Sequence, residues 1–271
     1  YMPLQLHELK FALSTLVMVL LAAAGNIIND YFDIRTDRIN KPDRVVVGKL
    51  VKRRVAMVSH HIINGLATLL GIYLAWDSGI WILAVIPIFM GTSLWFYSLQ
   101  FKKQAWIGNF VVALMIGIVP MWAGVFELPL LAKAMVIMGK DGQLFAQTSW
   151  LWLLGFSGFA FWLTLIREAQ KDMEDLRGDQ ISGFKTLPIL WGIGRTKQYV
   201  FGLHLVFFLF MGLVIAQVIP MLSNQTWKWM LLGMVTLTIG FPLFYGMFKS
   251  LTGDTSEHFA QASAATKWAM A

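Results

Sequence analysis

The chain has 271 residues, of which 57% are apolar and only 14% are charged, against roughly 25% charged residues in soluble domains. A net charge of +7 suits either nucleic acid or an anionic membrane surface, and the placement of the basic residues between apolar segments favours the membrane and argues against nucleic acid. Cysteine is absent, which excludes disulfides, a thiol nucleophile and thiolate metal sites.

In chain order, apolar segments long enough to cross a bilayer recur from the first residues to the last. A hydrocarbon core of roughly 30 Å needs about 20 helical residues, and runs of this length are too long for strands. We therefore predict an all-α, polytopic transmembrane helical bundle that forms a single domain over residues 1–271. The predicted spans are 9–30, 54–76, 79–98, 106–126, 149–171, 196–219 and 227–248, followed by an incomplete segment that begins near His258.

The ends of the chain carry no recognisable signal peptide. The first span begins soon after Tyr1, and the last residue, Ala271, falls inside an apolar segment. We interpret the chain as cut at both ends.

Three long connections separate the spans, and their charges predict the orientation. Residues 31–53 and 172–195 are polar and rich in Lys and Arg, whereas 127–148 is less polar. Because cytoplasmic connections carry an excess of Lys and Arg, we expect the two basic connections on the cytoplasmic side. In a bacterium or archaeon this membrane would be the plasma membrane.

The first polar connection begins with a periodic set of polar side chains. Asn29, Asp33 and Asp37 recur every four residues and would share one face of a helix that extends past the membrane edge. Asp30 flanks that face.

A second set lies at the end of the fifth span. Glu168, Asp172, Asp175 and Asp179 step by four, three and four residues, which again predicts one helix face. Both sets leave the membrane on the same basic side.

Carboxylates crowded on one face repel one another unless a cation lies between them. Mg²⁺ prefers oxygen ligands and is commonly held by carboxylates together with substrate phosphates. A single charged stretch at a helix end is often only a solvated face. Seven acids in two periodic sets on one side favour a Mg²⁺ site that holds a diphosphate, with neighbouring Lys and Arg completing the neutralisation.

These residues resemble the motifs of the UbiA superfamily of intramembrane prenyltransferases. The family's first motif, Asn-x-x-x-Asp-x-x-x-Asp, falls on Asn29, Asp33 and Asp37, and the second, Asp-x-x-x-Asp, on Asp175 and Asp179, with Asp172 one turn earlier. The stretch from Asp37 to Arg44 resembles the loop after the first motif. The stretch from Tyr97 to Lys102 resembles a Tyr-and-Lys stretch of the family, although some members have the Lys where Phe101 stands here.

The resemblance implies a nine-helix architecture, whose first helix and most of whose last are missing from this chain. It implies Mg²⁺-dependent transfer of a prenyl group from its diphosphate to a lipid-like acceptor, and no obligate protein partner. The expected catalytic residues are Asp33, Asp37, Asp175 and Asp179. The expected metal ligands are Asn29, Asp30, Asp33, Asp37, Asp172, Asp175 and Asp179. The expected substrate-binding residues are Arg44, Tyr97, Lys102, Lys171 and Lys185.

Within the superfamily, the run Asn29–Arg44 is most similar to geranylgeranylglycerol-phosphate geranylgeranyltransferases. This similarity implies a geranylgeranyl donor and the hydroxyl of geranylgeranylglyceryl phosphate as acceptor. Chlorophyll synthases and quinone-forming aromatic prenyltransferases remain alternatives. A transporter with an acid-lined pathway is an alternative of another class, although transporter acids typically lie near the bilayer midplane rather than at span ends.

Overall fold

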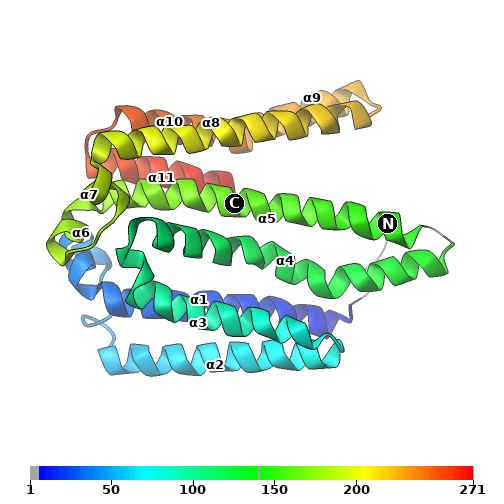
Figure 1. The fold of residues 1–271 in the computed structure, drawn as a ribbon, viewed down its shortest axis with the longest axis horizontal. Coiled ribbons are helices and arrows are strands. Elements are labelled where there is room, and N and C mark those ends of the chain that lie inside the picture. Colours follow the sequence, from blue (N-terminus) through cyan, green and yellow to red (C-terminus); the bar gives the residue numbers. More distant parts are fainter. Residues whose placement is uncertain (1–5, 140, 271) are drawn as a thin grey trace. The chain divides into compact units, whose positions relative to one another are not determined.

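The computed structural model describes residues 6–139 and 141–270, and the side chain of Arg44 lies outside the described part. Helices make up almost all of this part of the chain (Figure 1). The chain forms two compact units, one of residues 1–102 and 114–161 and the other of residues 103–113 and 162–271.

The first unit is built from the N-terminal helices and from parts of two long helices. Its elements are α1 (Glu8–Asn40), η1 (Pro42–Arg44), α2 (Arg53–Asp77), η2 (Trp81–Ala84), α3 (Val85–Leu99), the start of η3 (Phe101–Lys103), most of α4 (Ala105–Ile137) and the first part of α5 (Gly142–Glu174).

The second unit contains the beginning of α4, the end of α5 and the C-terminal helices. These are α6 (Leu176–Ser182), α7 (Leu187–Trp191), α8 (Ile193–Val218), η4 (Ile219–Met221), α9 (Gln225–Val235), the π-helical turn η5 (Thr236–Gly240), α10 (Phe241–Thr252) and α11 (Ser256–Met270).

Seven helical segments of the described residues are long and apolar enough to cross a membrane, as predicted. They are Glu8–Asn40, Arg53–Asp77, Trp81–Leu99, Ala105–Ile137, Gly142–Glu174, Ile193–Met221 and Gln225–Thr252. The protein is therefore an integral, multi-pass membrane protein.

Several predicted boundaries were wrong. The first helix continues through residues 31–40, as the spacing of the first motif predicts, whereas α4 and α5 unexpectedly occupy most of the predicted connection 127–148. Intrahelical hydrogen bonds satisfy the backbone polar groups in water as well as in lipid. A helix can therefore extend beyond the apolar stretch from which it was predicted. The predicted connection 172–195 likewise contains the short helices α6 and α7.

In the first unit, α1 packs most extensively against α2. The indole N–H of Trp122 donates to the carbonyl of Ser14 at 3.0 Å. The amide of Asn64 on α2 donates to the carbonyl of Gly91 on α3 at 3.3 Å, which is the interhelical bond expected of a polar residue within a span.

In the second unit, a cluster of three buried, hydrogen-bonded side chains joins α5, α10 and α11. The side chains of Gln170, Ser250 and Thr266 are fully buried. The amide nitrogen of Gln170 donates to Ser250 Oγ at 3.0 Å, and its amide oxygen accepts from Thr266 Oγ1 at 2.8 Å. These bonds fix the packing of three helices near the end of α5.

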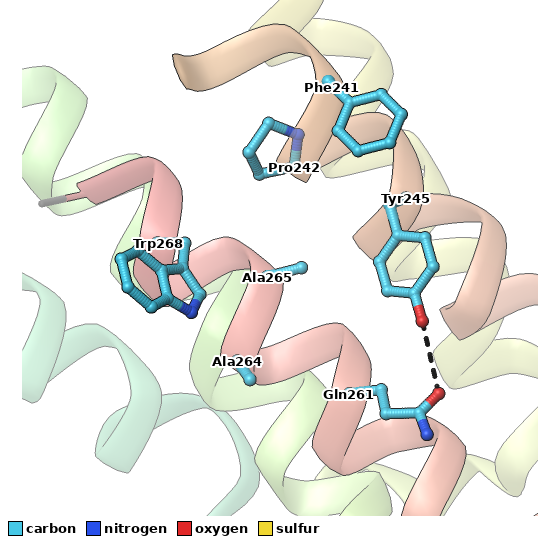
Figure 2. Close-up of a pocket in the computed structure, with 7 residues that line it drawn as sticks. All are labelled: Phe241, Pro242, Tyr245, Gln261, Ala264, Ala265 and Trp268. Atoms are coloured by element: carbon cyan, nitrogen blue, oxygen red, sulfur yellow. Dashed lines mark hydrogen bonds between the residues drawn. The ribbon is translucent and has the colours of Figure 1, made fainter. Parts of the chain in front are cut away.

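An open apolar groove lies along α10 and α11 (Figure 2). The hydroxyl of Tyr245 donates to Gln261 Oε1 at 3.3 Å on its wall. None of the predicted site residues lines this groove, which is lined by Phe241, Pro242, Tyr245, Gln261, Ala264, Ala265 and Trp268.

Candidate active site

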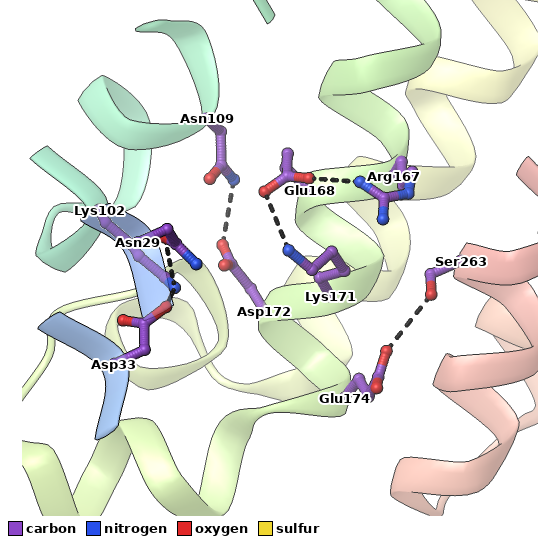
Figure 3. Close-up of polar contacts among 10 residues, drawn as sticks. All are labelled: Asn29, Asp33, Lys102, Asn109, Arg167, Glu168, Lys171, Asp172, Glu174 and Ser263. Atoms are coloured by element: carbon purple, nitrogen blue, oxygen red, sulfur yellow. Dashed lines mark hydrogen bonds and ion pairs between the residues drawn. The ribbon is translucent and has the colours of Figure 1, made fainter. Parts of the chain in front are cut away.

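The first polar motif holds a lysine from elsewhere in the first unit. Lys102, on η3, donates to Asn29 Oδ1 at 3.2 Å and forms an ion pair with the carboxylate of Asp33 (Figure 3). Asp33 is buried, with 4% of its surface exposed. An amide oxygen and a carboxylate from successive turns of α1 therefore converge on one cationic group.

The helical spacing predicted for this motif is confirmed, because α1 runs without interruption to Asn40. Asp37 follows one turn after Asp33 and is half-buried, whereas Asp30 is exposed. Tyr97, near the end of α3, is half-buried.

The second motif begins with a carboxylate that an asparagine holds in place. The Asn109 amide, on the second unit's part of α4, donates to Asp172 Oδ2 at 3.0 Å (Figure 3). Asn109 was not among the predicted site residues. Its position within the apolar run Ile107–Val112 was the available signal, because a polar side chain in a span needs a partner.

The second motif does not lie on one continuous helix, contrary to the prediction. Helix α5 ends at Glu174 and α6 begins at Leu176, with Asp175 between them at φ −92° and ψ 6°. Backbone hydrogen bonds of the α-helical type, from an N–H to the carbonyl four residues earlier, continue across the break. They join Asp175 N–H to the carbonyl of Lys171 and Asp179 N–H to the carbonyl of Asp175. The spacing is therefore compatible with both an unbroken helix and this bend.

The basic residues at the end of α5 contact a carboxylate of the same helix. Glu168 is buried, with 6% of its surface exposed, and accepts from Arg167 Nη1 at 2.9 Å. Its other oxygen lies 3.6 Å from Lys171 Nζ. Glu174, at the end of the helix, accepts from Ser263 Oγ on α11 at 3.3 Å (Figure 3).

A backbone hydrogen bond joins the segment after the second motif to the segment that precedes α4. Gly183 closes α6 at φ +73°, in the left-handed region that favours glycine. The backbone N–H of Lys185 then donates to the carbonyl of Lys103 at 2.9 Å. The side chain of Lys185 is exposed.

Mg²⁺ is compatible with the chemistry of these donors. Within residues 6–139 and 141–270, no three carboxylate or imidazole side chains gather closely enough to form a ready-made metal site. The oxygens of Asn29 and Asp33 nevertheless already converge on a cation, the Lys102 ammonium. Carboxylate and amide oxygens are hard ligands of the kind that Mg²⁺ accepts.

Curated relatives match about seven tenths of the chain. The digeranylgeranylglyceryl phosphate synthase of Thermococcus sibiricus is 33% identical over 184 residues, which cover 68% of this chain and 57% of the relative. The synthase of the same name from Thermococcus kodakarensis is 34% identical over 200 residues, covering 73% of this chain and 62% of the relative. The matched region thus spans about three fifths of these relatives' lengths.

Two solved structures have a similar fold. One is described as giving structural and mechanistic insights into the biosynthesis of digeranylgeranylglyceryl phosphate synthase in membranes. It matches this chain with a TM-score of 0.60 and 25% sequence identity, and the match covers 98% of this chain and 83% of the other. The other, a UbiA homolog from Archaeoglobus fulgidus bound to DMAPP and Mg²⁺, matches with a TM-score of 0.58 and 15% identity over 97% of this chain and 87% of its own. At that identity the second likeness concerns the fold alone. The model of the UbiA prenyltransferase family matches residues 3–268, and the chain belongs to this family.

Proposed function

We propose that this chain acts as a single-domain prenyltransferase. It transfers a geranylgeranyl group from its diphosphate to a lipid-like acceptor, the hydroxyl of geranylgeranylglyceryl phosphate. The observation that carries the proposal is the convergence of Asn29 and Asp33 on the Lys102 ammonium, because it combines metal-type oxygen donors with a cation suited to phosphate. The names of the curated relatives support this acceptor over aromatic or chlorophyll-type acceptors.

The two polar motifs would serve one diphosphate. When bound, Mg²⁺ would neutralise the diphosphate and make it a better leaving group. The residues proposed to hold it are Asn29, Asp30, Asp33, Asp37, Asp172, Asp175 and Asp179, of which Asp33, Asp37, Asp175 and Asp179 are the proposed catalytic set. Arg44, Tyr97, Lys102, Lys171 and Lys185 would contact the substrate.

Two adjacent residues of the chain each make a contact within their own unit. Lys102 contacts the first motif, and the carbonyl of the next residue, Lys103, accepts the hydrogen bond from Lys185 in the segment that follows the second motif. Successive Cα atoms lie only about 3.8 Å apart. A single short segment thus makes contacts with the residues of one motif and with the residues after the other.

The roles of the protein side chains follow from their contacts. Asn29 and Asp33 hold the Lys102 ammonium in one direction, so that a phosphate oxygen would meet a charge that is already oriented. Asn109 fixes one oxygen of Asp172. As the allylic C–O bond breaks, the diphosphate would keep the bonding electron pair, and the acceptor hydroxyl oxygen would attack the prenyl carbon and lose its proton.

The mouth of the site is proposed to face the cytoplasm. Both motifs lie at the ends of spans, and the connections that follow these spans hold 10 of the 22 Lys and Arg residues. Connections rich in Lys and Arg remain on the cytoplasmic side.

An incorporation assay tests the reaction. The purified chain, in vesicles, is given radiolabelled geranylgeranyl diphosphate and a panel of acceptors, with and without EDTA. We expect a lipid product with geranylgeranylglyceryl phosphate, and its loss with EDTA. Product only with an aromatic acid would reject the proposed acceptor and keep the enzyme class. Movement of the diphosphate across the vesicle membrane without any product would instead support a transporter.

A further inference from the structure

A tight turn precedes α2 in the first unit. The carbonyl of Val46 accepts hydrogen bonds from the N–H groups of Leu50 at 2.9 Å and Val51 at 3.1 Å, and Gly48 N–H donates to Val51 O at 2.7 Å. Gly48 has φ +83°, which an L side chain rarely adopts. Residues 46–51 therefore form a defined turn, here called the α2 turn.

The α2 turn buries one apolar side chain and exposes two others. Val47 is 5% exposed, whereas Val46 is 42% exposed and Leu50, at the tip, is 78% exposed. The turn also lies against α1, because a Cβ on Gly48 would be 3.7 Å from Ile34 Cδ1. The backbone thus holds Leu50 outward, while the turn approaches α1 at Gly48.

The position of the turn relative to the lipid follows from α2. The helix begins at Arg53, and its exposed apolar stripe starts two residues later and recurs at helical spacing. In a membrane-spanning helix such a stripe faces lipid. Leu50 therefore precedes the first lipid-facing residue by five positions. The stripe consists of Val55, Val58, Ile62, Leu66 and Leu69.

Basic residues flank the exposed leucine in the chain. Lys49, Lys52 and Arg54 are all exposed. In the described part of the chain, no acidic side chain forms an ion pair with any of the three. An apolar tip with basic neighbours, at the end of a lipid-facing stripe, complements the border between anionic headgroups and acyl chains.

We propose that the α2 turn is a binding site for anionic phospholipids of the bilayer. Leu50 inserts among the upper acyl chains, and Lys49, Lys52 and Arg54 bind the phosphate groups of the surrounding headgroups. The proposal does not depend on the proposed reaction, because none of these four residues belongs to either polar motif.

The absence of cysteine from the chain allows a direct test. A nitroxide is attached at Leu50→Cys in the full chain, which is reconstituted either in phosphatidylcholine vesicles or in vesicles with 30% phosphatidylglycerol. Its exposure to dissolved oxygen and to a water-soluble nickel reagent reports its depth. Ile62→Cys, on the lipid-facing stripe, is the control for a label in lipid, and Thr255→Cys, next to Asp254, is the control for a label in water.

We expect the label at position 50 to be shielded from nickel in the anionic vesicles and less so in phosphatidylcholine. Adding Lys49→Gln, Lys52→Gln and Arg54→Gln should remove the difference, with the ratio of lipid-embedded to water-exposed label falling about fivefold for each charge removed. Equal nickel exposure in both vesicles would overturn the proposal, as would shielding that does not depend on the three charges. A shift produced by inorganic diphosphate in phosphatidylcholine vesicles would also overturn it, by indicating a site for soluble phosphate.

Discussion

Lys102 and Asp33 form an ion pair although 69 residues separate them in the chain. The Asp33 side chain is only 5% exposed, and that of Lys102 is 26% exposed. A carboxylate so removed from water is costly unless a positive charge accompanies it. Lys102 thus provides the compensating charge for the central acid of the first motif.

The first prediction concerns the stability of this pair. Lys102→Met would leave the buried Asp33 carboxylate uncompensated, and removing one partner of a buried pair typically costs about 3–5 kcal/mol. We expect the lower end of that range, because Lys102 is partly exposed. The apparent Tm of the purified protein should fall, and the double variant Asp33→Asn with Lys102→Met should recover most of the loss.

The matched control is Lys103→Met, which removes an exposed charge next to the pair. This variant should change the apparent Tm little, because exposed charges contribute about 0–1 kcal/mol. Additive losses in the double variant would contradict the pairing of Lys102 with Asp33.

The second prediction concerns turnover. Asp33→Ala and Asp175→Ala should each lower prenyl transfer at least about 100-fold, because each removes a proposed metal-binding carboxylate. Both variants should still insert and purify. Asp254→Ala is the control: this acid lies outside both motifs and pairs with Lys197 on the surface, at 2.9 Å. Near-normal turnover in either motif variant would contradict the metal roles.

Much of the fold and the helical course of the first motif could be predicted from local patterns. The apolar runs identified all seven spans, and the four-residue spacing of Asn29, Asp33 and Asp37 matches the unbroken α1. These features are local, since a helix imposes its own period on the sequence.

The bend at Asp175 and the bond from Asn109 could not be predicted in the same way. On both sides of the bend, backbone N–H groups still donate to the carbonyl four residues earlier. The spacing of the acids in the sequence is therefore the same as for a straight helix. The partner of Asn109 lies 63 residues away on another helix. An isolated polar residue in a span predicts that a partner exists without saying which residue it is.

The third prediction tests Asn109 as a positioning residue. Asn109→Leu removes the hydrogen bond that orients Asp172, and loss of such an outer contact typically costs about 10–100-fold in metal affinity or activity. We expect kcat to fall by that factor and the Mg²⁺ concentration for half-maximal activity to rise. A purely structural role would lower the apparent Tm and leave the Mg²⁺ dependence unchanged.

Asn64→Leu provides the comparison, because Asn64 is also an asparagine within a span but bonds only a backbone carbonyl. It should cost about 0.6 kcal/mol of stability, as interhelical hydrogen bonds in membranes commonly do, with no change in Mg²⁺ dependence. If the two variants shift the Mg²⁺ dependence equally, the positioning role of Asn109 is wrong.

The fourth prediction concerns the close approach of α10 and α11 at Gly246. A Cβ added there would lie 3.2 Å from Ala262 O, 3.3 Å from Thr266 Oγ1 and 3.6 Å from Gln170 Nε2. Gly246→Ala should therefore push the two helices apart and strain the buried hydrogen bonds of Gln170. Overpacking of this kind costs about 1–3 kcal/mol of stability.

Gly202→Ala on α8 is the matched control, because nothing lies within 4 Å of its added Cβ. The apparent Tm should fall for Gly246→Ala and stay the same or rise for Gly202→Ala, since alanine favours a helix by about 1 kcal/mol over glycine. Equal effects of the two substitutions would mean that α10 and α11 do not meet at this glycine.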